Sequence, residues 1–80
     1  MTREEIMGQL TEIFRDIFDD EDIVLTDATT SDDIEDWDSL EQINLLVAIE
    51  KQFNIKFQLA DVANLENVGS MIDLVSKMIG

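Results

Sequence analysis

The sequence predicts an all-α fold: a small bundle of three main helices and one short helix, with a long loop between helices one and two. Two observations support this prediction. Apolar residues recur at spacings of three and four in three segments, as on one face of a helix. No segment of useful length shows the polar and apolar alternation of a strand. The chain has 80 residues, 45% of them hydrophobic, and we expect residues 1–80 to form a single domain.

Residues 2–18 are predicted to form the first helix. Thr2 and Glu5 have the spacing of a capping box, in which each side chain bonds the backbone N–H of the other residue. The apolar face of this helix is formed by Ile6, Leu10, Ile13, Phe14, Ile17 and Phe18.

Residues 19–38 are predicted to form a long acidic loop. Loops of this length are uncommon inside a compact domain and are often functional. We expect some of its apolar residues to pack onto the core, so that the loop is ordered. These apolar residues are Ile23, Val24, Leu25, Ile34 and Trp37.

Residues 39–53 are predicted to form the second helix. Asp38 is a candidate N-cap with Glu41 at the capping-box position, and Ser39 with Gln42 is the alternative pair. The helix has two neighbouring apolar stripes: Leu45, Leu46, Ile49 and Phe53 form one, and Leu40, Ile43 and Val47 form the other. We expect one stripe to face the core and the other to remain exposed or available to a partner.

The remaining helices are predicted near residues 59–64, as a short piece, and over residues 68–79. Asn67 is the expected N-cap of the last helix. Its apolar face is formed by Val68, Met71, Ile72, Val75, Met78 and Ile79. Both methionines are expected to fill the core.

Composition excludes several classes of function. The chain has no Cys and no His, which excludes disulfides, thiolate metal sites and the usual zinc ligands. Its net charge of −14 opposes binding to nucleic acid or to anionic membranes and favours partner proteins with basic patches. The acidic run DDEDIVLTD lacks the ligand spacing of a calcium loop, so a solvated loop is expected and no metal site is predicted.

The sequence also shows no targeting segment. The first ten residues, MTREEIMGQL, lack the apolar stretch of a signal peptide. No apolar run approaches the roughly 20 residues that span a bilayer. We therefore expect a cytoplasmic protein.

Ser39 lies where the loop is predicted to become a helix. A catalytic serine needs a neighbouring base, but the chain has no His, its lysines fall in no obvious motif, and the G-x-S-x-G pattern is absent. A hydrolase reaction at Ser39 is therefore close to excluded, and we predict that the protein is not an enzyme. Two interpretations stay open: Ser39 caps the helix, or a separate enzyme attaches a phosphate-linked group to it, which a helix N-terminus would stabilise.

The wider pattern resembles the acyl carrier proteins, the phosphopantetheine-binding family. The resemblance rests on DWDSLEQINLLVAIEKQFNIKF, residues 36–57, and extends over essentially the whole chain. Members of that family have Asp-Ser-Leu at the start of helix two, then Glu and Phe toward its end, and a fourth helix opening near Val. The matching residues are Asp38, Ser39, Leu40, Glu50, Phe53 and Val68.

The resemblance implies that Ser39 receives 4′-phosphopantetheine from coenzyme A through a phosphopantetheinyl transferase that uses Mg²⁺. The thiol of this arm would then hold acyl groups as thioesters. Partner enzymes would contact Asp38, Leu40, Glu41, Val47 and Glu50. The acyl chain would shelter among Leu45, Leu46, Ile49 and Phe53.

The resemblance implies two kinds of partner: the transferase, and acyl-transfer, ligase and synthase enzymes with basic docking patches. It also implies that the carrier is a monomer. Four residues depart from common family patterns: Trp37, Asn44, Lys51 and Gln58. These departures favour a specialised pathway, such as polyketide synthesis, lipid modification or surface-polysaccharide acylation, over housekeeping fatty-acid synthesis.

Three alternatives remain. Within the carrier class, the protein could carry aminoacyl or peptidyl groups, although the Gly-Gly that usually precedes the motif in peptidyl carriers is absent. Outside that class, it could be an unmodified acidic interaction module. It could also be an acidic mimic of nucleic acid, against which the second apolar stripe of the helix argues.

Overall fold

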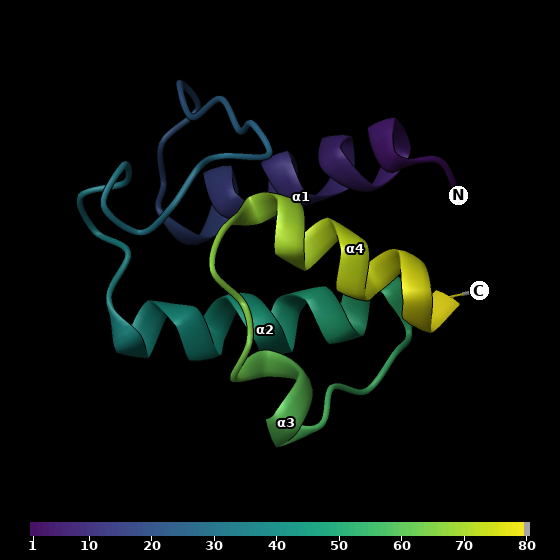
Figure 1. Cartoon of the computed structure of the whole chain (residues 1–80). Coiled ribbons are helices and arrows are strands. Elements are labelled where there is room, and N and C mark those ends of the chain that lie inside the picture. The colour runs from purple at the N-terminus through teal and green to yellow at the C-terminus, as the bar shows by residue number, and fades with distance from the viewer. Residues whose placement is uncertain (80) are drawn as a thin grey trace.

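The computed structural model describes residues 1–79 and contains four helices and no strand within that range (Figure 1). The helices are α1 (Arg3–Ile17), α2 (Ser39–Phe53), α3 (Leu59–Val62) and α4 (Val68–Ile79). The all-α prediction is therefore confirmed. None of these helices has the length and hydropathy needed to cross a membrane.

The helix boundaries follow the predicted caps. Thr2 and Glu5 form the complete capping box that begins α1, with Thr2 Oγ1 accepting from the Glu5 N–H at 3.2 Å and Glu5 Oε1 accepting from the Thr2 N–H at 3.1 Å. Phe18 is the C-cap, so α1 is one residue shorter at each end than predicted. The short helix α3 ends at Val62 rather than Asn64.

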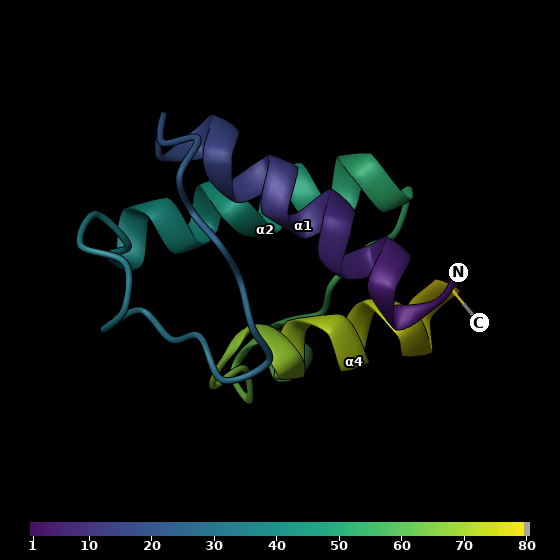
Figure 2. The same ribbon diagram turned by 90° about the horizontal axis from the view of Figure 1, so that it is seen from above.

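The core lies between α1, α2 and α4. Helix α1 contacts both of the others, and Figure 2 shows α4 lying to one side of the α1 and α2 pair. The fully or nearly fully buried apolar residues come from all three helices and from the loop: Ile6, Leu10, Phe14, Ile23, Leu25, Leu45, Ile49, Val68, Met71, Ile72 and Val75. This burial supplies the main favourable term in folding.

The long loop is ordered by contacts at several points along its length. Ile23 and Leu25 are buried, whereas Val24 is 75% exposed. Figure 2 shows the loop running from the end of α1 to the start of α4 before it turns back to α2. There the carbonyl oxygens of Thr29 and Asp27 accept the N–H groups of Val68 and Gly69, each at 2.9 Å. The prediction of an ordered loop is confirmed.

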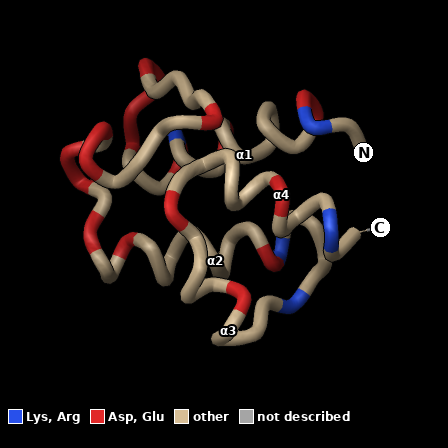
Figure 3. The backbone as a smooth tube through the Cα atoms, viewed as in Figure 1, with Lys and Arg blue, Asp and Glu red and all other residues tan. Residues whose placement is uncertain are grey.

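Charge is distributed unevenly over the molecule (Figure 3). Residues 19–38 contain ten of the nineteen acidic residues and no Lys or Arg. Lys51 and Lys77 lie in the last turns of α2 and α4, and Lys56 follows α2 closely. The end of the molecule with the loop and the start of α2 is therefore acidic, and the lysines gather at the opposite end.

Candidate functional site

The first turn of α2 presents Ser39 to solvent. Asp38 is the N-cap, and its Oδ1 accepts the Glu41 N–H at 2.8 Å. Ser39 is the first residue of the helix and is exposed. Because Asp38 provides the cap, the alternative in which Ser39 caps the helix is wrong. The Ser39 hydroxyl is accessible to another molecule.

The capping box predicted for α2 is only half formed. The Glu41 carboxylate accepts from Asn44 Nδ2 at 3.1 Å instead of folding back onto the backbone of Asp38. Asp38 therefore satisfies one of the N–H groups that a helix start leaves unpaired. Within residues 1–79, the N–H groups of Ser39 and Leu40 have no backbone or side-chain acceptor.

Trp37 fixes the loop just before this turn. Its ring packs edge-on against Phe14 of α1, with centroids 5.1 Å apart and an interplanar angle of 84°. Its indole Nε1–H donates to Gln42 Oε1 at 2.7 Å. The sequence predicted that Trp37 packs the loop onto the bundle, and this is confirmed. The bond to Gln42 was not predicted, because it depends on the orientation of the loop relative to α2.

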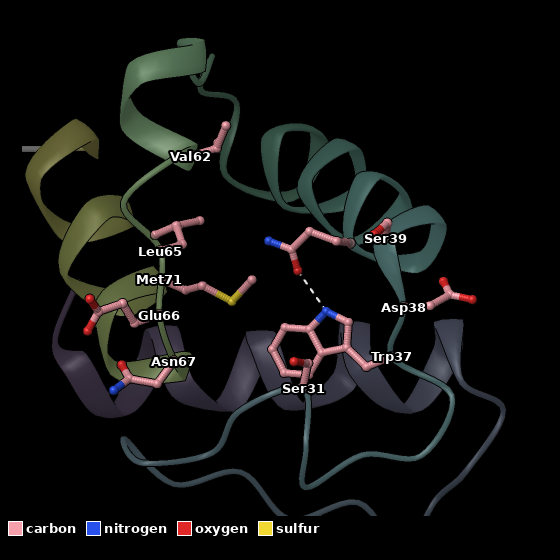
Figure 4. A pocket seen from close by; sticks show the side chains of 10 residues that line it. Ser31, Trp37, Asp38, Ser39, Val62, Leu65, Glu66, Asn67 and Met71 are labelled. Carbon is pink, nitrogen blue, oxygen red and sulfur yellow. Dashed lines mark hydrogen bonds between the residues drawn. The ribbon is translucent and has the colours of Figure 1, made fainter.

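A hollow of about 560 Å³ opens beside Ser39 (Figure 4). Sites for small molecules commonly have volumes in this range. The sequence did not predict the hollow, because its walls come from the loop, the start of α2, the end of α3, the segment between α3 and α4, and the start of α4. Its lining residues are Ser31, Trp37, Asp38, Ser39, Gln42, Val62, Leu65, Glu66, Asn67 and Met71.

The four residues predicted to shelter an acyl chain lie elsewhere. Leu45 and Ile49 are fully buried in the core, and Leu46 and Phe53 are partly buried. None of the four lines the hollow beside Ser39. The structure thus gives Leu45 and Ile49 a packing role, and the sheltering of an acyl chain by this group stays a prediction.

The residues predicted to meet partners divide into two groups: Asp38, Leu40 and Val47 are exposed, whereas Glu41 and Glu50 are half-buried. Leu40, Ile43 and Val47, which we call the exposed stripe, are 65%, 59% and 44% exposed. Asp38 is also exposed, beside this stripe. Glu50, by contrast, is half-buried, and its Oε2 accepts the Phe57 N–H at 2.8 Å. Glu50 therefore stabilises the chain between α2 and α3, a role that the sequence did not predict.

The clustered acidic side chains do not form a metal site in the described part of the chain. No three His, Cys, Asp or Glu side chains among residues 1–79 lie in an arrangement that could hold a metal ion.

Comparisons with known proteins agree with this geometry. Residues 8–75 match the family described as "Phosphopantetheine attachment site". The chain is 32% identical to the acyl carrier protein of Petrotoga mobilis over 80 residues, which is 99% of this chain and 93% of that protein. It also resembles the solution structure of a holo acyl carrier protein from Geobacter metallireducens, with a TM-score of 0.86 and 48% identity over 91% of this chain and 84% of that one.

These matches confirm the resemblance drawn from residues 36–57. The family model covers most of the chain, and the helical fold is that of the solved carrier. Proteins of this family carry acyl groups on a phosphopantetheine prosthetic group and are not catalysts. The chain belongs to the phosphopantetheine-binding acyl carrier proteins.

Proposed function

We propose that Ser39 holds the 4′-phosphopantetheine arm, and that the protein delivers acyl thioesters on this arm from one enzyme to the next. The observation that carries this assignment is the position of Ser39: it is exposed at the first position of α2, and its neighbour Asp38 supplies the cap. The hydroxyl is thus accessible without loss of the helix.

The residues around Ser39 fit a phosphodiester. The N–H groups of Ser39 and Leu40 have no acceptor in the described part of the chain, and a helix N-terminus has a partial positive charge that favours an anion. This charge partly offsets the nearby Asp38. The arm supplies the thiol that a chain without Cys lacks.

The transfer reaction requires little of this chain. With no His in the sequence, the base that takes the Ser39 proton belongs to the transferase. The Ser39 oxygen forms the new ester bond to phosphorus, and the adenosine part of coenzyme A leaves with the remaining phosphates. Asp38 and Leu40 flank this oxygen in the sequence and are both exposed, so they provide the first contacts with the transferase.

Partner enzymes meet the acidic end of the molecule. The loop and the start of α2 concentrate negative charge around Ser39 (Figure 3), and opposite charge on a partner speeds encounter. The exposed stripe then provides apolar contact without disturbing the core. Basic docking patches on acyl-transfer, ligase and synthase enzymes would complement this surface.

The pathway served is proposed from the residues that depart from common family patterns. Trp37 occupies the position before Asp38 and lines the hollow, and Lys51 adds a positive charge to the far end of α2. These features favour a carrier for a specialised acylation, such as polyketide synthesis or the modification of lipids or polysaccharides, over general fatty-acid synthesis.

Intact mass spectrometry tests the attachment. The protein is incubated with a promiscuous phosphopantetheinyl transferase, coenzyme A and Mg²⁺, beside the variants Ser39→Ala and Ser31→Ala. We expect wild type and Ser31→Ala to gain the mass of one phosphopantetheine and Ser39→Ala to gain nothing. Ser31 is the matched control because it is an exposed serine that lines the same hollow. A folded wild-type protein without mass gain would favour the unmodified interaction module.

The exposed stripe has its own test. Ile43→Ser should leave the free energy of unfolding within about 0.5 kcal/mol of wild type, because the side chain is largely solvated. It should slow transfer by the transferase at limiting carrier concentration, measured as the initial rate of mass gain. An unchanged rate together with a large loss of stability would assign Ile43 to the core instead.

A further inference from the structure

The chain between α2 and α3 folds back against the last turn of α2. Asn54, the C-cap of α2, adopts the left-handed backbone conformation with φ 54°, which ends the helix and reverses the chain. Glu50 then holds the returning segment at two points: its carbonyl oxygen accepts the Ile55 N–H at 3.0 Å, and its carboxylate accepts the Phe57 N–H at 2.8 Å. Lys56 lies between these two anchored residues, so its backbone is held beside the end of α2.

The returning segment forms one wall of an open groove of about 510 Å³. The other wall is the face of α2 that contains Val47 and Lys51, which are four residues apart and therefore on the same side of the helix. Ile55 and Lys56 line the groove from the returning segment. Val47 is 44% exposed and also belongs to the exposed stripe, so the groove continues the surface on which we propose that partner enzymes dock.

The groove has unpaired positive charge in a molecule of net charge −14. Arg3 forms ion pairs with two aspartates, and Arg15 donates to a carbonyl oxygen of the loop. Lys51 and Lys56, by contrast, are exposed and form no ion pair with any residue among 1–79. Of the described residues that line the groove, Glu50 alone is acidic, and its carboxylate already accepts a backbone N–H. The two lysine ammonium groups are therefore available to carboxylates of another molecule.

The acidic loop is too far away to cancel this local charge. It lies at the opposite end of a molecule whose longest dimension is 31 Å (Figure 3). At physiological ionic strength, exposed charges more than about 8 Å apart are largely screened from each other. A partner at the groove therefore encounters the two lysines, whereas a partner at Ser39 encounters the acidic end.

We propose that this groove docks a segment of a partner enzyme in which carboxylates flank an apolar side chain. The carboxylates pair with Lys51 and Lys56, and the apolar side chain contacts Val47 and Ile55. The two lysines thereby select among partners, because a docking surface that is basic throughout is repelled at the groove. This inference rests on the proposal that partners dock along the exposed stripe, and it does not depend on attachment at Ser39.

Titration of the isotope-labelled, unmodified protein with synthetic peptides, followed by nuclear magnetic resonance, tests the proposal. The probe is a short helical peptide in which Leu lies between two Glu at helical spacing; in two control peptides, Gln or Lys replaces both Glu. We expect the acidic peptide to shift the amide signals of Val47, Lys51, Ile55 and Lys56. The Gln peptide should bind there roughly five-fold more weakly, the effect of losing two exposed ion pairs. The Lys peptide should shift signals of the acidic loop instead.

Variants of the lysines identify the charges that bind the peptide. Lys51→Gln combined with Lys56→Gln should also weaken the acidic peptide roughly five-fold. Lys77→Gln is the matched control, because it removes the same charge from the same end of the molecule but does not line the groove. It should change the affinity by less than about two-fold, since its charge is screened. The substituted side chains are exposed, so every variant should remain folded.

Four outcomes would overturn the proposal. Absence of shifts at the groove would leave no docking there. Equal affinity of wild type and the double variant for the acidic peptide, or equal affinity of wild type for the Glu and Gln peptides, would show that the lysines do not contribute. Equal shifts with acetate at the same carboxylate concentration would mean that the lysines bind lone anions only. Failure of the proposed attachment is separate, because it is measured as absent mass gain at Ser39.

Discussion

The starts of α4 and α2 differ in how many of their first backbone N–H groups have a hydrogen-bond acceptor. At the start of α4, the first three N–H groups are all paired: Val68 with the carbonyl oxygen of Thr29, Gly69 with that of Asp27, and Ser70 with Asn67 Oδ1 at 2.8 Å. At the start of α2, the Asp38 carboxylate accepts only the N–H of the third residue, Glu41.

The difference separates a helix end that is held by the loop from one that is open to solvent. Carbonyl oxygens of the loop accept the first two N–H groups of α4, and these hydrogen bonds fix the path of the loop. The start of α2 faces solvent and keeps two unpaired N–H groups next to the exposed Ser39. Unpaired N–H groups at an exposed helix end are solvated at little cost, so the fold can leave this end available for modification.

The largest effect is expected for Gly69→Ala, at the start of α4, where the loop accepts the helix N–H groups. An added Cβ would lie 3.0 Å from the Asp27 carbonyl oxygen and 3.2 Å from Asp27 Cβ. Crowding and a weakened Gly69 N–H bond should lower the free energy of unfolding by about 2 kcal/mol. Chemical denaturation would measure the change.

The control for this prediction is Gly8→Ala in α1. Nothing lies within 4 Å of the Cβ that alanine would add, so the variant should gain about 1 kcal/mol from helix propensity. Stabilisation of both variants to the same extent would show that the loop moves to accommodate the added Cβ. The loop would then not hold the start of α4 rigidly.

The next largest effect is expected for Asp38→Ala, at the solvent-facing start of α2. Loss of the side-chain cap of α2 should cost about 1 kcal/mol, measured in the same denaturation experiment. Ser39→Ala should change stability by less than about 0.5 kcal/mol, because its hydroxyl does not cap the helix. A cost for Ser39→Ala equal to that of Asp38→Ala would mean that the two residues share the cap.

The smallest expected effect is a dependence of stability on pH that arises at a third helix start, that of α1. Hydrogen bonds from the Thr2 backbone N–H and then from its side chain lower the pKa of the Glu5 carboxyl below the ordinary value of 4.5. A lowered pKa stabilises the fold above the ordinary value, and this contribution disappears as pH falls through the folded-state pKa. The closure of α4 uses carbonyl and amide oxygens, which do not titrate in this range.

Glu5→Gln removes the titrating group and provides the measurement. We expect the difference in the free energy of unfolding between wild type and Glu5→Gln to change between pH 6 and pH 3, in the direction of a relative loss for wild type at low pH. A difference that stays constant over this range would mean that the Glu5 bonds contribute equally in both protonation states.

Local sequence patterns predicted most of the helices and half of the candidate site. The bounds of α2 and α4 agree with prediction because Asp38 and Asn67 cap them from adjacent positions. The exposed stripe followed from helical spacing alone. By contrast, the bond of Trp37 to Gln42 and that of Glu50 to Phe57 depend on how the connecting segments turn, which spacing does not encode.

The sequence could not predict the hollow beside Ser39 for the same reason. Its walls bring Ser31, Gln42 and Met71 together, residues that are far apart in the sequence and belong to three different segments. Their meeting depends on the loop being held at the start of α4, through Asp27 and Thr29. Two carbonyl oxygens in an acidic loop give no sequence signal that they will accept from a helix more than thirty residues away.

The uneven charge of the molecule determines how it will lie on a solid support. A positively charged matrix would adsorb the acidic end and cover Ser39. Lys51, Lys56 and Lys77 are exposed at the opposite end, where the N-terminus also lies (Figure 1). Coupling through amines would therefore anchor the protein with Ser39 facing the liquid, and binding measurements on a surface would sample the end at which we propose that the arm is attached.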